Sequence, residues 1–553
     1  MRARTPLIYR PVRKAPRENW MRFFGCVVIA GGLAGIATAA QTQPDASRFP
    51  PVPDLASPPE FPDPLVMSDG RHVTTREQWY NERRPELITL FEQYMYGFLP
   101  PPPEELAGKI ERNDRTAFNG RAAIKEVTVT FGPPELPRIH LMLVVPNRRE
   151  GPAPVILGLN YFGNHTLVRD PAVGLSTNWM PERGEGVVNH RATEASRGTW
   201  VDIWQIEKTI ERGYAVATFY NGDIDPDRPD QRGIQTHYRK QDPQFDWGTI
   251  GAWAWGLQRA VDYLVTDPDL DRNRIIVTGH SRLGKAALLA AAFDQRIALA
   301  IPHQAGCGGS APSRTTIKRA ETVKQINDQF PHWFNARFKE FNDQPERLPF
   351  DQHCLVALCA PRPVLFSNGR QDTWINPEGQ FEVLRAAAPV YRLLEAGDFI
   401  GTELPPDGKL IGGTLGFFVR PGGHSLRSED WTAFLDFADA QLGRPTKPRS
   451  MAPATGTPST AAGKTKERQA ALLEVPRWEV HEFELRDLNL NLRADPERTN
   501  TARIIRLQPQ ANSTSVLQIW ACLNSSSRKL RNRHRTSRLS KSYGVLANAM
   551  DGT

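Results

Sequence analysis

Cysteine is scarce in this sequence. Only five cysteines occur among 553 residues, and no two of them form a C-x-x-C pair. The sequence therefore predicts neither a disulfide framework nor a cysteine-based metal site. Cys354 and Cys359 stand five residues apart among apolar neighbours, and we expect both to be buried free thiols.

The sequence also lacks a long apolar run and a strong net charge in its central region. The apolar run at 23–37 is too short to span a membrane comfortably. The net charge of +8 comes with Arg-rich segments near both ends, so the central region is closer to neutral. This distribution does not predict a nucleic-acid partner. The 40% of hydrophobic and 24% of charged residues are ordinary for a soluble globular protein.

The first forty residues have the pattern of an export signal. Basic residues precede the apolar run, which ends at 37–40 in small residues of the kind that signal peptidase accepts. We predict a signal peptide at 1–40, a mature chain that begins near Gln41, and a periplasmic or extracellular protein without a stable membrane anchor. An uncleaved anchor is the alternative, and the sequence leaves open whether translation starts at Met1 or Met21.

The length predicts about two to four domains. A Pro-rich extension at 41–74 is expected to form a tether or to wrap over the surface of a main domain at 75–443. Residues 444–470 are rich in Pro, Thr, Ala and Gly and indicate a linker. Residues 471–553 open with one alternating strand-like run and continue as a polar segment, so we predict a truncated β module that is largely disordered.

Strand-like and helix-like segments alternate along the main domain, which predicts an α/β fold with a mostly parallel sheet covered on both faces. The expected strands are 123–130, 139–145, 154–160, 214–219, 274–277, 363–367 and 417–420. The expected helices are 75–96, 252–265, 286–293 and 430–442.

The most informative motif is Gly-His-Ser-Arg-Leu-Gly-Lys at 279–285. It follows a buried strand and precedes a helix of Ala and Leu, which predicts a nucleophile elbow that exposes the hydroxyl of Ser281 on a strained turn. Gly279 would let the backbone pass close to the helix, and Gly284 would let the helix approach the strand. Leu283 replaces the second glycine of the common G-x-S-x-G form, so the motif alone is also typical of an ordinary strand-to-helix turn.

Two further polar residues follow predicted strands. Asp372 lies in the loop after 363–367, and His424 ends a Gly-containing loop after 417–420. In α/β-hydrolases the catalytic residues follow the chain order Ser, acid, His. A serine needs a histidine to take its proton, and the histidine needs a carboxylate to fix its tautomer. The order predicts a triad, with a helix cap and an ordinary loop histidine as the alternatives.

Four blocks of sequence resemble the bacterial glucuronoyl esterases, carbohydrate esterase family fifteen, which are 4-O-methyl-glucuronoyl methylesterase-like members of the α/β-hydrolase superfamily. The resemblance covers 79–442 and accounts for Leu283, because the family elbow reads Ser-Arg-x-Gly-Lys. The blocks are Gly-Leu-Asn-Tyr-Phe-Gly-Asn-His-Thr at 158–166, Asp-Trp-Gly-Thr-Ile-Gly-Ala-Trp-Ala-Trp-Gly at 246–256, the elbow at 279–285, and Ala-Pro-Arg-Pro at 360–363.

The resemblance implies an α/β-hydrolase three-layer sandwich. It also implies a secreted serine carboxylesterase that hydrolyses the ester between 4-O-methyl-glucuronic acid of xylan and lignin alcohols. Such an enzyme uses an acyl-enzyme and needs neither a metal nor an organic cofactor. We expect it to act as a monomer on a glucuronate ester of plant cell-wall polysaccharide.

The resemblance also implies roles by position. Ser281 matches the nucleophile, His424 the base, and Arg282 the arginine that supports the oxyanion. Lys285 and Trp374 match residues that contact the sugar. The alternatives are a solvated helix face for Arg282 and Lys285, and an ordinary rim aromatic for Trp374.

The chain departs from the family pattern at Gln304. Many members carry a glutamate there, within a segment like Asn-Glu-Ser-Gly, whereas this chain reads Pro-His-Gln-Ala-Gly at 302–306. Glutamine cannot carry the charge that stabilises an imidazolium. We therefore assign the acid to Asp372 and group Gln304 with the substrate-binding residues, while the sequence leaves open which carboxylate completes the triad.

Two other functions are compatible with the sequence. One is a different carbohydrate esterase, such as a deacetylase, on the same fold. The other is a catalytically impaired carbohydrate-binding relative, which Gln304 suggests. Arg282 and Lys285 beside Ser281 favour a uronate ester, because its ring hydroxyls need polar partners. The intact Ser281 and His424 argue against an impaired site, and the sequence does not identify the alcohol side of the ester.

Overall fold

The computed structural model describes residues 49–230, 233–242 and 245–445, together with two short strands near the C-terminus. The described residues belong to one compact unit, which begins at Phe49. The predicted signal peptide, the linker beyond residue 445 and most of the predicted β module lie outside the described residues. No helix in the described part of the chain is both long and apolar enough to cross a membrane.

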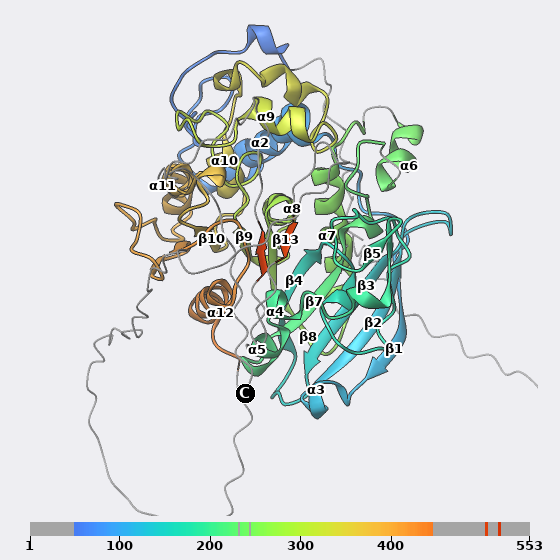
Figure 1. Ribbon diagram of the computed structural model, residues 1–553. Coiled ribbons are helices and arrows are strands. Elements are labelled where there is room, and N and C mark those ends of the chain that lie inside the picture. Colours follow the sequence, from blue (N-terminus) through green and yellow to red (C-terminus); the bar gives the residue numbers. More distant parts are fainter. Residues whose placement is uncertain (1–48, 231–232, 243–244, 446–503, 507–517, 521–553) are drawn as a thin grey trace, which may run out of the picture. The chain divides into compact units, whose positions relative to one another are not determined.

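A ten-stranded sheet forms the centre of the described residues, in the order β1-β2-β3-β7-β4-β8-β9-β10-β12-β11 (Figure 1). Its strands are β1 Ala107–Asp114, β2 Ala122–Thr130, β3 Ile139–Pro146, β4 Ala153–Asn160, β7 Ala215–Tyr220, β8 Leu270–His280, β9 Ile297–His303, β10 Val364–Gly369, β11 Leu410–Gly412 and β12 Leu415–Arg420. Two small hairpins pair β5 Val187–Val188 with β6 Arg191–Ala192, and β13 Ile504–Arg506 with β14 Gln518–Trp520.

The predicted α/β fold with a mostly parallel sheet is confirmed. The pairs from β7 through β4, β8, β9 and β10 to β12 are parallel. The pairs β1–β2, β2–β3, β3–β7 and β11–β12 are antiparallel. All residues of the central strands β4 and β10 are buried, as expected for strands covered on both faces. The edge strand β1 is mostly exposed and polar, so the sequence pattern did not reveal it.

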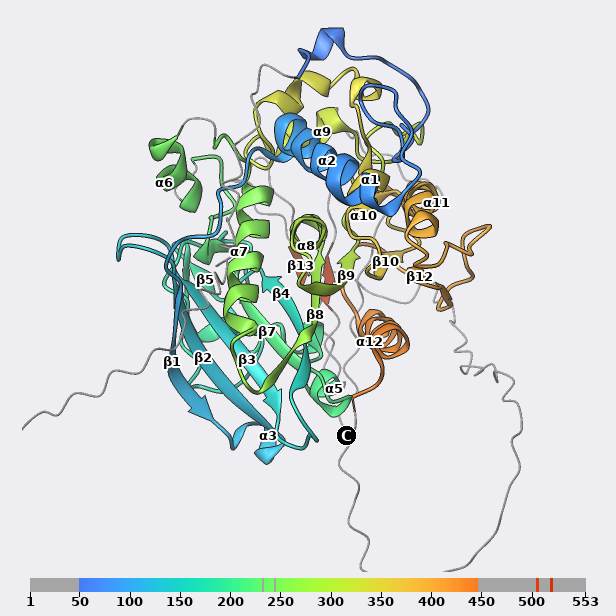
Figure 2. The same ribbon diagram turned by 180° about the vertical axis from the view of Figure 1, so that it is seen from behind.

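Helices cover both faces of the sheet, which gives the three layers. The alternation of strand β8 shows this directly, because Ile275 and Val277 belong to one hydrophobic cluster and Ile276 to the other. The first cluster includes helices α7, α8, α10 and α11, and the second includes α4, α5 and α12. Figure 2 shows α7 in front of the strands, and Figure 1 shows α4 and α5 on the opposite side.

The helices of the two layers are α4 Val201–Trp204, α5 Ile206–Glu211, α7 Thr249–Leu264, α8 Arg282–Phe293, α10 Gln352–Ala357, α11 Pro377–Leu393 and α12 Ser428–Leu442. The remaining α-helices are α1 Arg76–Gln78, α2 Arg84–Phe91, α3 Ala117–Gly120, α6 Ile234–Gln241 and α9 Val323–Gln329. The predicted helix at 75–96 forms as α1 and α2 joined to the π-helical turns η3 Trp79–Arg83 and η4 Glu92–Tyr96.

From residue 49 onward, arginine side chains hold the Pro-rich segment against the main domain. Arg314 donates to the carbonyls of Pro58 (3.1 Å) and Glu60 (2.8 Å). Arg347 donates to the carbonyl of Pro53 at 3.0 Å. Proline lacks a backbone N–H but keeps its carbonyl, so arginine side chains can fix a segment that forms no regular strand.

The elbow requires both of its glycines. A Cβ atom on Gly279 would lie 2.2 Å from the carbonyl oxygen of Leu283. A Cβ on Gly284 would lie 2.8 Å from the carbonyl oxygen of Gly279 and 3.1 Å from that of His303. The predicted close approach of strand and helix at these two positions is therefore confirmed.

We expect Gly279→Ala to destabilise the protein by about 1–3 kcal/mol, because the added methyl group collides with backbone that cannot move without distorting the elbow. Urea-induced unfolding measures this change. Gly151→Ala is the matched control, since no heavy atom lies within 4 Å of its added Cβ. Equal stability of the two variants would show that the elbow tolerates the extra methyl group.

Candidate active site

Ser281 occupies the turn between β8 and α8. Its backbone dihedrals, φ 58° and ψ −126°, lie in a strained region for a residue with a side chain. The backbone N–H of Ser281 donates to the carbonyl of His303 at 2.9 Å, and the Ser281 carbonyl accepts from Gly284 at 2.9 Å. The hydroxyl of Tyr161 donates to the carbonyl of His280, the residue before Ser281, at 2.5 Å. The strand, the helix and Tyr161 thus fix the serine.

Asp372 and His424 come together because β10 and β12 are parallel neighbours. Gly369 at the end of β10 is in register with Arg420 at the end of β12, so the loops that follow start side by side. Nδ1 of His424 lies 2.6 Å from Oδ2 of Asp372. The Asp372 side chain is 6% exposed and the His424 side chain is 40% exposed. The carboxylate is therefore shielded, whereas the imidazole opens to solvent.

Gln304 lies beneath this pair. It is fully buried and has a left-handed backbone, with φ 47°. Its Nε2 donates to Oδ2 of Asp372 and to the carbonyl of Gly423, each at 3.1 Å, and its Oε1 accepts from the N–H of Ser425 at 2.9 Å. The side chain of Gln304 is thus enclosed by protein groups, and its substrate-binding role stays a prediction.

Three imidazole rings lie in a row behind the exposed face of His424. The ring centroids of His280 and His424 are 4.5 Å apart, and those of His280 and His303 are 5.1 Å apart. Nε2 of His303 is 2.9 Å from the carbonyl oxygen of Ser425, and this contact anchors the loop that carries His424. Desolvation, and then the neighbouring His424 and His303, hold the pKa of His280 well below its ordinary value. A neutral His280 adds no positive charge beside His424.

Arg282, the first residue of α8, is held by Asp227. The guanidinium forms an ion pair with Oδ2 of Asp227 and lies 4.6 Å from the ring centroid of Trp333 and 4.9 Å from that of Phe330. Oδ1 of Asp227 is within 3.0 Å of His332 Nε2 and accepts from Trp333 Nε1 at 2.9 Å.

The charge state of Asp227 follows from these contacts. Burial alone would raise the pKa of Asp227, but the hydrogen bond from His332, the charge of Arg282 and the hydrogen bond from Trp333 hold it well below its ordinary value. Asp227 therefore stays ionised and keeps the guanidinium in one orientation.

Lys285 stands one turn further along α8 and is 4% exposed. Its Nζ donates to the carbonyls of Ala305 (2.7 Å) and Cys307, and lies 3.8 Å from Oε2 of Glu321. Burial lowers the pKa of Lys285 and raises the pKa of Glu321, and each charge opposes the shift of the other. Trp374 is 39% exposed, and its backbone carbonyl accepts from the N–H of Glu321 at 2.9 Å, which connects this buried pair to the surface.

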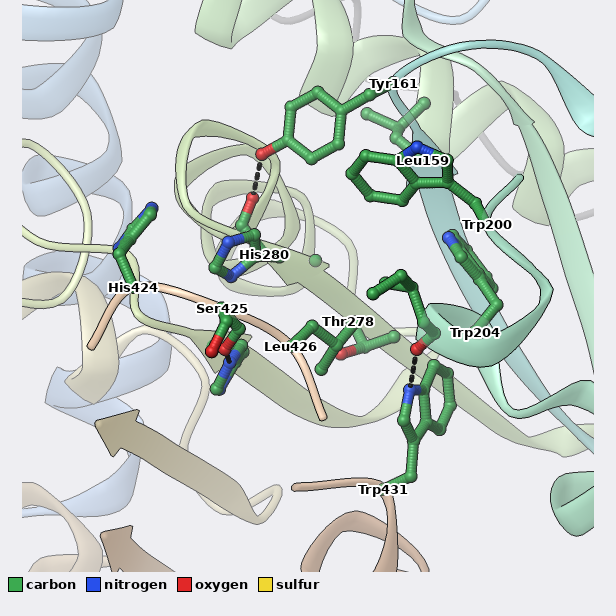
Figure 3. A pocket seen from close by; sticks show the side chains of 13 residues that line it. Leu159, Tyr161, Trp200, Trp204, Thr278, His280, His424, Ser425, Leu426 and Trp431 are labelled. Atoms are coloured by element: carbon green, nitrogen blue, oxygen red, sulfur yellow. Dashed lines mark hydrogen bonds between the residues drawn. The ribbon is translucent and has the colours of Figure 1, made fainter. Parts of the chain in front are cut away.

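His424 also lines an apolar cavity of about 210 Å³, together with tryptophans of α4 and α12. Figure 3 shows His280, His424 and Ser425 at one side of it and Trp200 and Trp204 at the other. Its lining residues are Leu159, Tyr161, Trp200, Ile203, Trp204, Thr278, Gly279, His280, His303, His424, Ser425, Leu426 and Trp431.

Side chains that can bind metal ions are scattered through the described residues. Within this part of the chain, no group of three or more His, Cys, Asp and Glu side chains is arranged to hold a metal ion. Cys354 and Cys359 are buried free thiols, as predicted.

Comparison with known proteins identifies the family. A family model described as "Glucuronyl esterase, fungi" matches residues 189–395. The carbohydrate esterase MZ0003 from an unknown prokaryotic organism is 45% identical over 398 residues, which cover 70% of this chain and 91% of that protein. The chain belongs to the glucuronoyl esterases, carbohydrate esterase family fifteen.

Two solved structures agree with this assignment. A promiscuous esterase of carbohydrate esterase family fifteen from a marine bacterial metagenome is 44% identical, with a TM-score of 0.65 over 70% of this chain and 98% of that one. A glucuronoyl esterase from Solibacter usitatus is 35% identical, with a TM-score of 0.65 over 71% of this chain and 100% of that one. The predicted family resemblance is confirmed, and the protein is a carboxylic ester hydrolase.

Sequence reasoning missed three residues of this glucuronoyl esterase site. Tyr161 was noted only as part of a family block, and Asp227 and Glu321 were not singled out. Asp227 and Glu321 lie in irregular segments, where no strand or helix periodicity indicates which way a side chain points. Only their contacts with Arg282 and Lys285 reveal them.

We expect Asp227→Asn to lower kcat about tenfold to a hundredfold, because Arg282 loses the charge that orients it and small displacements at a reacting centre are costly. Steady-state hydrolysis of an alkyl glucuronate measures the effect. Glu382→Gln, which breaks an exposed ion pair with Arg385, is the matched control. An unchanged kcat in folded Asp227→Asn would show that Arg282 needs no anchor.

Proposed function

We propose that this chain is an exported serine esterase that hydrolyses the ester between (4-O-methyl-)glucuronic acid of xylan and lignin alcohols. The observation that carries the proposal is the 2.6 Å contact between His424 Nδ1 and Asp372 Oδ2. Both residues follow parallel strands of the sheet in which Ser281 follows β8. Membership of the glucuronoyl esterase family supports the glucuronate half of the substrate. The predicted signal peptide supports export, and we propose that the mature protein is a monomer without a membrane anchor.

In the proposed mechanism the Ser281 hydroxyl attacks the ester carbonyl while His424 takes its proton through Nε2. Asp372 holds Nδ1 of His424, which fixes the tautomer and stabilises the imidazolium that forms. The tetrahedral intermediate then expels the alcohol, which receives the proton from His424, and leaves a glucuronoyl ester on Ser281. Water, activated by His424, hydrolyses this acyl-enzyme and regenerates the serine.

Negative charge develops on the carbonyl oxygen during both steps. We propose that the N-terminus of α8 and the Arg282 guanidinium stabilise it, because donors that are fixed before the reaction are effective there. The anchoring of Arg282 by Asp227 and two aromatic rings supports this role. It also limits how far the guanidinium can move during the reaction.

The uronate ring is proposed to bind over Trp374, with Glu321 and Lys285 as polar partners at the bottom of the site. The exposed indole offers a flat surface, and the charged pair lies directly behind it, because the N–H of Glu321 donates to the Trp374 carbonyl. A deacetylase, the alternative within the esterases, would have no need for this buried pair beside Ser281. The Lys285–Glu321 contact therefore favours a uronate substrate.

We expect the full-length enzyme to hydrolyse benzyl glucuronate and to leave acetylated xylan largely intact. Ser281→Ala and Asp372→Asn should each lower kcat by about 10³-fold or more, since the first removes the nucleophile and the second the carboxylate that orients the base. Release of benzyl alcohol and of acetate measures the two reactions, and circular dichroism checks that the variants fold. Preferential release of acetate would contradict the proposed substrate.

Gln304 is proposed as a positioning residue for the triad. One amide group binds the carboxylate of Asp372 and the residues on both sides of His424. Glutamine suits this place because its NH₂ group donates twice, to a carboxylate and to a carbonyl, while its oxygen accepts. A glutamate would turn the donor into a second carboxylate beside Asp372.

We expect Gln304→Glu to lower kcat about tenfold or more near neutral pH, because two adjacent carboxylates cannot both ionise easily and the bond to Gly423 is lost. Its pH–rate profile should differ from that of the wild type, whereas Gln304→Met should lose activity with an unshifted profile. Gln352→Glu, a change of a second fully buried glutamine outside these loops, controls for the cost of a buried acid. Wild-type activity in Gln304→Glu would exclude the positioning role.

A further inference from the structure

We propose that Arg420 is a positioning residue for the catalytic base, because its buried guanidinium fixes the loop that carries His424. This inference rests on the proposed function and deepens it, since it names the group that holds the base of the triad in place. The contacts of Arg420, of Asp430 and of Ser425 each support it.

Arg420 is the last residue of β12, and its side chain is 2% exposed. An arginine is almost never buried so completely unless its charge is paired. Its Nη1 donates to the carbonyl of Pro421 at 2.9 Å, and its Nη2 donates to the carbonyl of Ser425 and, at 3.1 Å, to the Ser425 hydroxyl. The guanidinium therefore binds the loop both before and after His424.

Asp430 on α12 balances the charge of Arg420 and holds the far end of the loop. Its side chain is fully buried, and its Oδ2 accepts from Arg420 Nε at 2.7 Å and from the backbone N–H of Arg427 at 2.9 Å. Its Oδ1 accepts from Ser367 Oγ at 3.2 Å. The segment from Pro421 to Arg427 is thus tied at both of its ends to one buried ion pair.

Every polar atom of Ser425, the residue directly after His424, has a partner. Its N–H donates to Gln304 Oε1 at 2.9 Å, and its carbonyl oxygen accepts from Arg420 and lies 2.9 Å from His303 Nε2. Its hydroxyl accepts from Arg420 Nη2. Because Arg420 contacts both the backbone and the side chain of Ser425, a rotation of this residue would break two hydrogen bonds from a charged donor.

Stability alone is a weak explanation for this buried pair, because the cost of removing two charges from water can exceed their attraction. The shape of the loop offers a better one. Residues 421–427 have no regular secondary structure, and Gly422 has a φ of 98°, which a residue with a side chain rarely adopts. Such a segment leaves carbonyl groups without ladder partners, and the planar fork of a guanidinium can bind several of them at once.

Arg420→Lys tests the positioning role. Lysine leaves Asp430 with a counter-charge but offers a single ammonium group in place of the fork that binds Pro421 and Ser425. We expect kcat for benzyl glucuronate to fall about tenfold to a hundredfold with little change in KM, since a displaced base slows the chemical step and leaves sugar binding intact. Steady-state kinetics measure both constants, and circular dichroism checks the fold.

The leaving group separates a displaced base from a loss of folded enzyme. In the proposed mechanism His424 gives a proton to the departing alcohol, and phenoxide needs this proton less than benzyl alkoxide does. In Arg420→Lys, kcat/KM should therefore fall less for phenyl glucuronate than for benzyl glucuronate. Arg259→Lys is the matched control, because Arg259 is 3% exposed and paired with Asp262 at 2.5 Å, but lies on α7. Its kinetics should match those of the wild type.

The outcomes distinguish this inference from the proposed function. If the wild type hydrolyses neither ester, or folded Ser281→Ala stays active, the proposed function fails. If Ser281→Ala is inactive but folded Arg420→Lys keeps the wild-type kcat, only the positioning role is overturned. An equal fall for both esters, or the same fall in Arg259→Lys, would also overturn it, because activity would then follow the amount of folded protein.

Ser425→Ala decides the question if Arg420→Lys does not fold. It removes one acceptor of Arg420 in the loop and leaves the ion pair with Asp430 in place. We expect kcat for benzyl glucuronate to fall about threefold to tenfold, with a smaller fall for phenyl glucuronate. Wild-type kinetics in this variant would overturn the positioning role.

Discussion

One carboxylate oxygen, Oδ2 of Asp372, connects the parts of this site. It lies 2.6 Å from His424 Nδ1 and accepts from Gln304 Nε2 at 3.1 Å, within a side chain that is 6% exposed. Low exposure strengthens both contacts and makes an unpaired partner costly. The loop that carries His424 contains two glycines, follows the end of β12 and has no regular secondary structure of its own.

The loop is nevertheless fixed, by side chains from three neighbouring strands. Gln304 follows β9, Asp372 follows β10, and the buried Arg420 at the end of β12 donates to the side chain of Ser425 at 3.1 Å and to Asp430 at 2.7 Å. Parallel strands place all of these residues at the same edge of the sheet. In the proposed site, Gln304 is thus compatible with an active esterase, because Asp372 after the neighbouring strand supplies the acid.

A charged and an apolar environment lie close together in this part of the molecule. Charged groups are buried on α8 and beside Trp374, where Lys285 and Glu321 lie 3.8 Å apart. The space between β4, α4 and the His424 loop is apolar instead. Burial makes charges expensive unless they are paired, and the charged environment contains its own partners.

The sequence by itself determined the family, the parallel sheet, the elbow and the chain order of Ser281, Asp372 and His424, because these depend on local patterns: apolar strands, glycines at a tight turn and residues just beyond strand ends. The export signal, the domain boundaries and the roles of the site residues stay predictions. Tertiary structure alone decided that Gln304 is buried under Asp372, that Asp227 holds Arg282, and that an apolar cavity adjoins His424. These features join residues far apart in the chain through side chains whose directions no periodicity specifies, so only the packed structure reveals them.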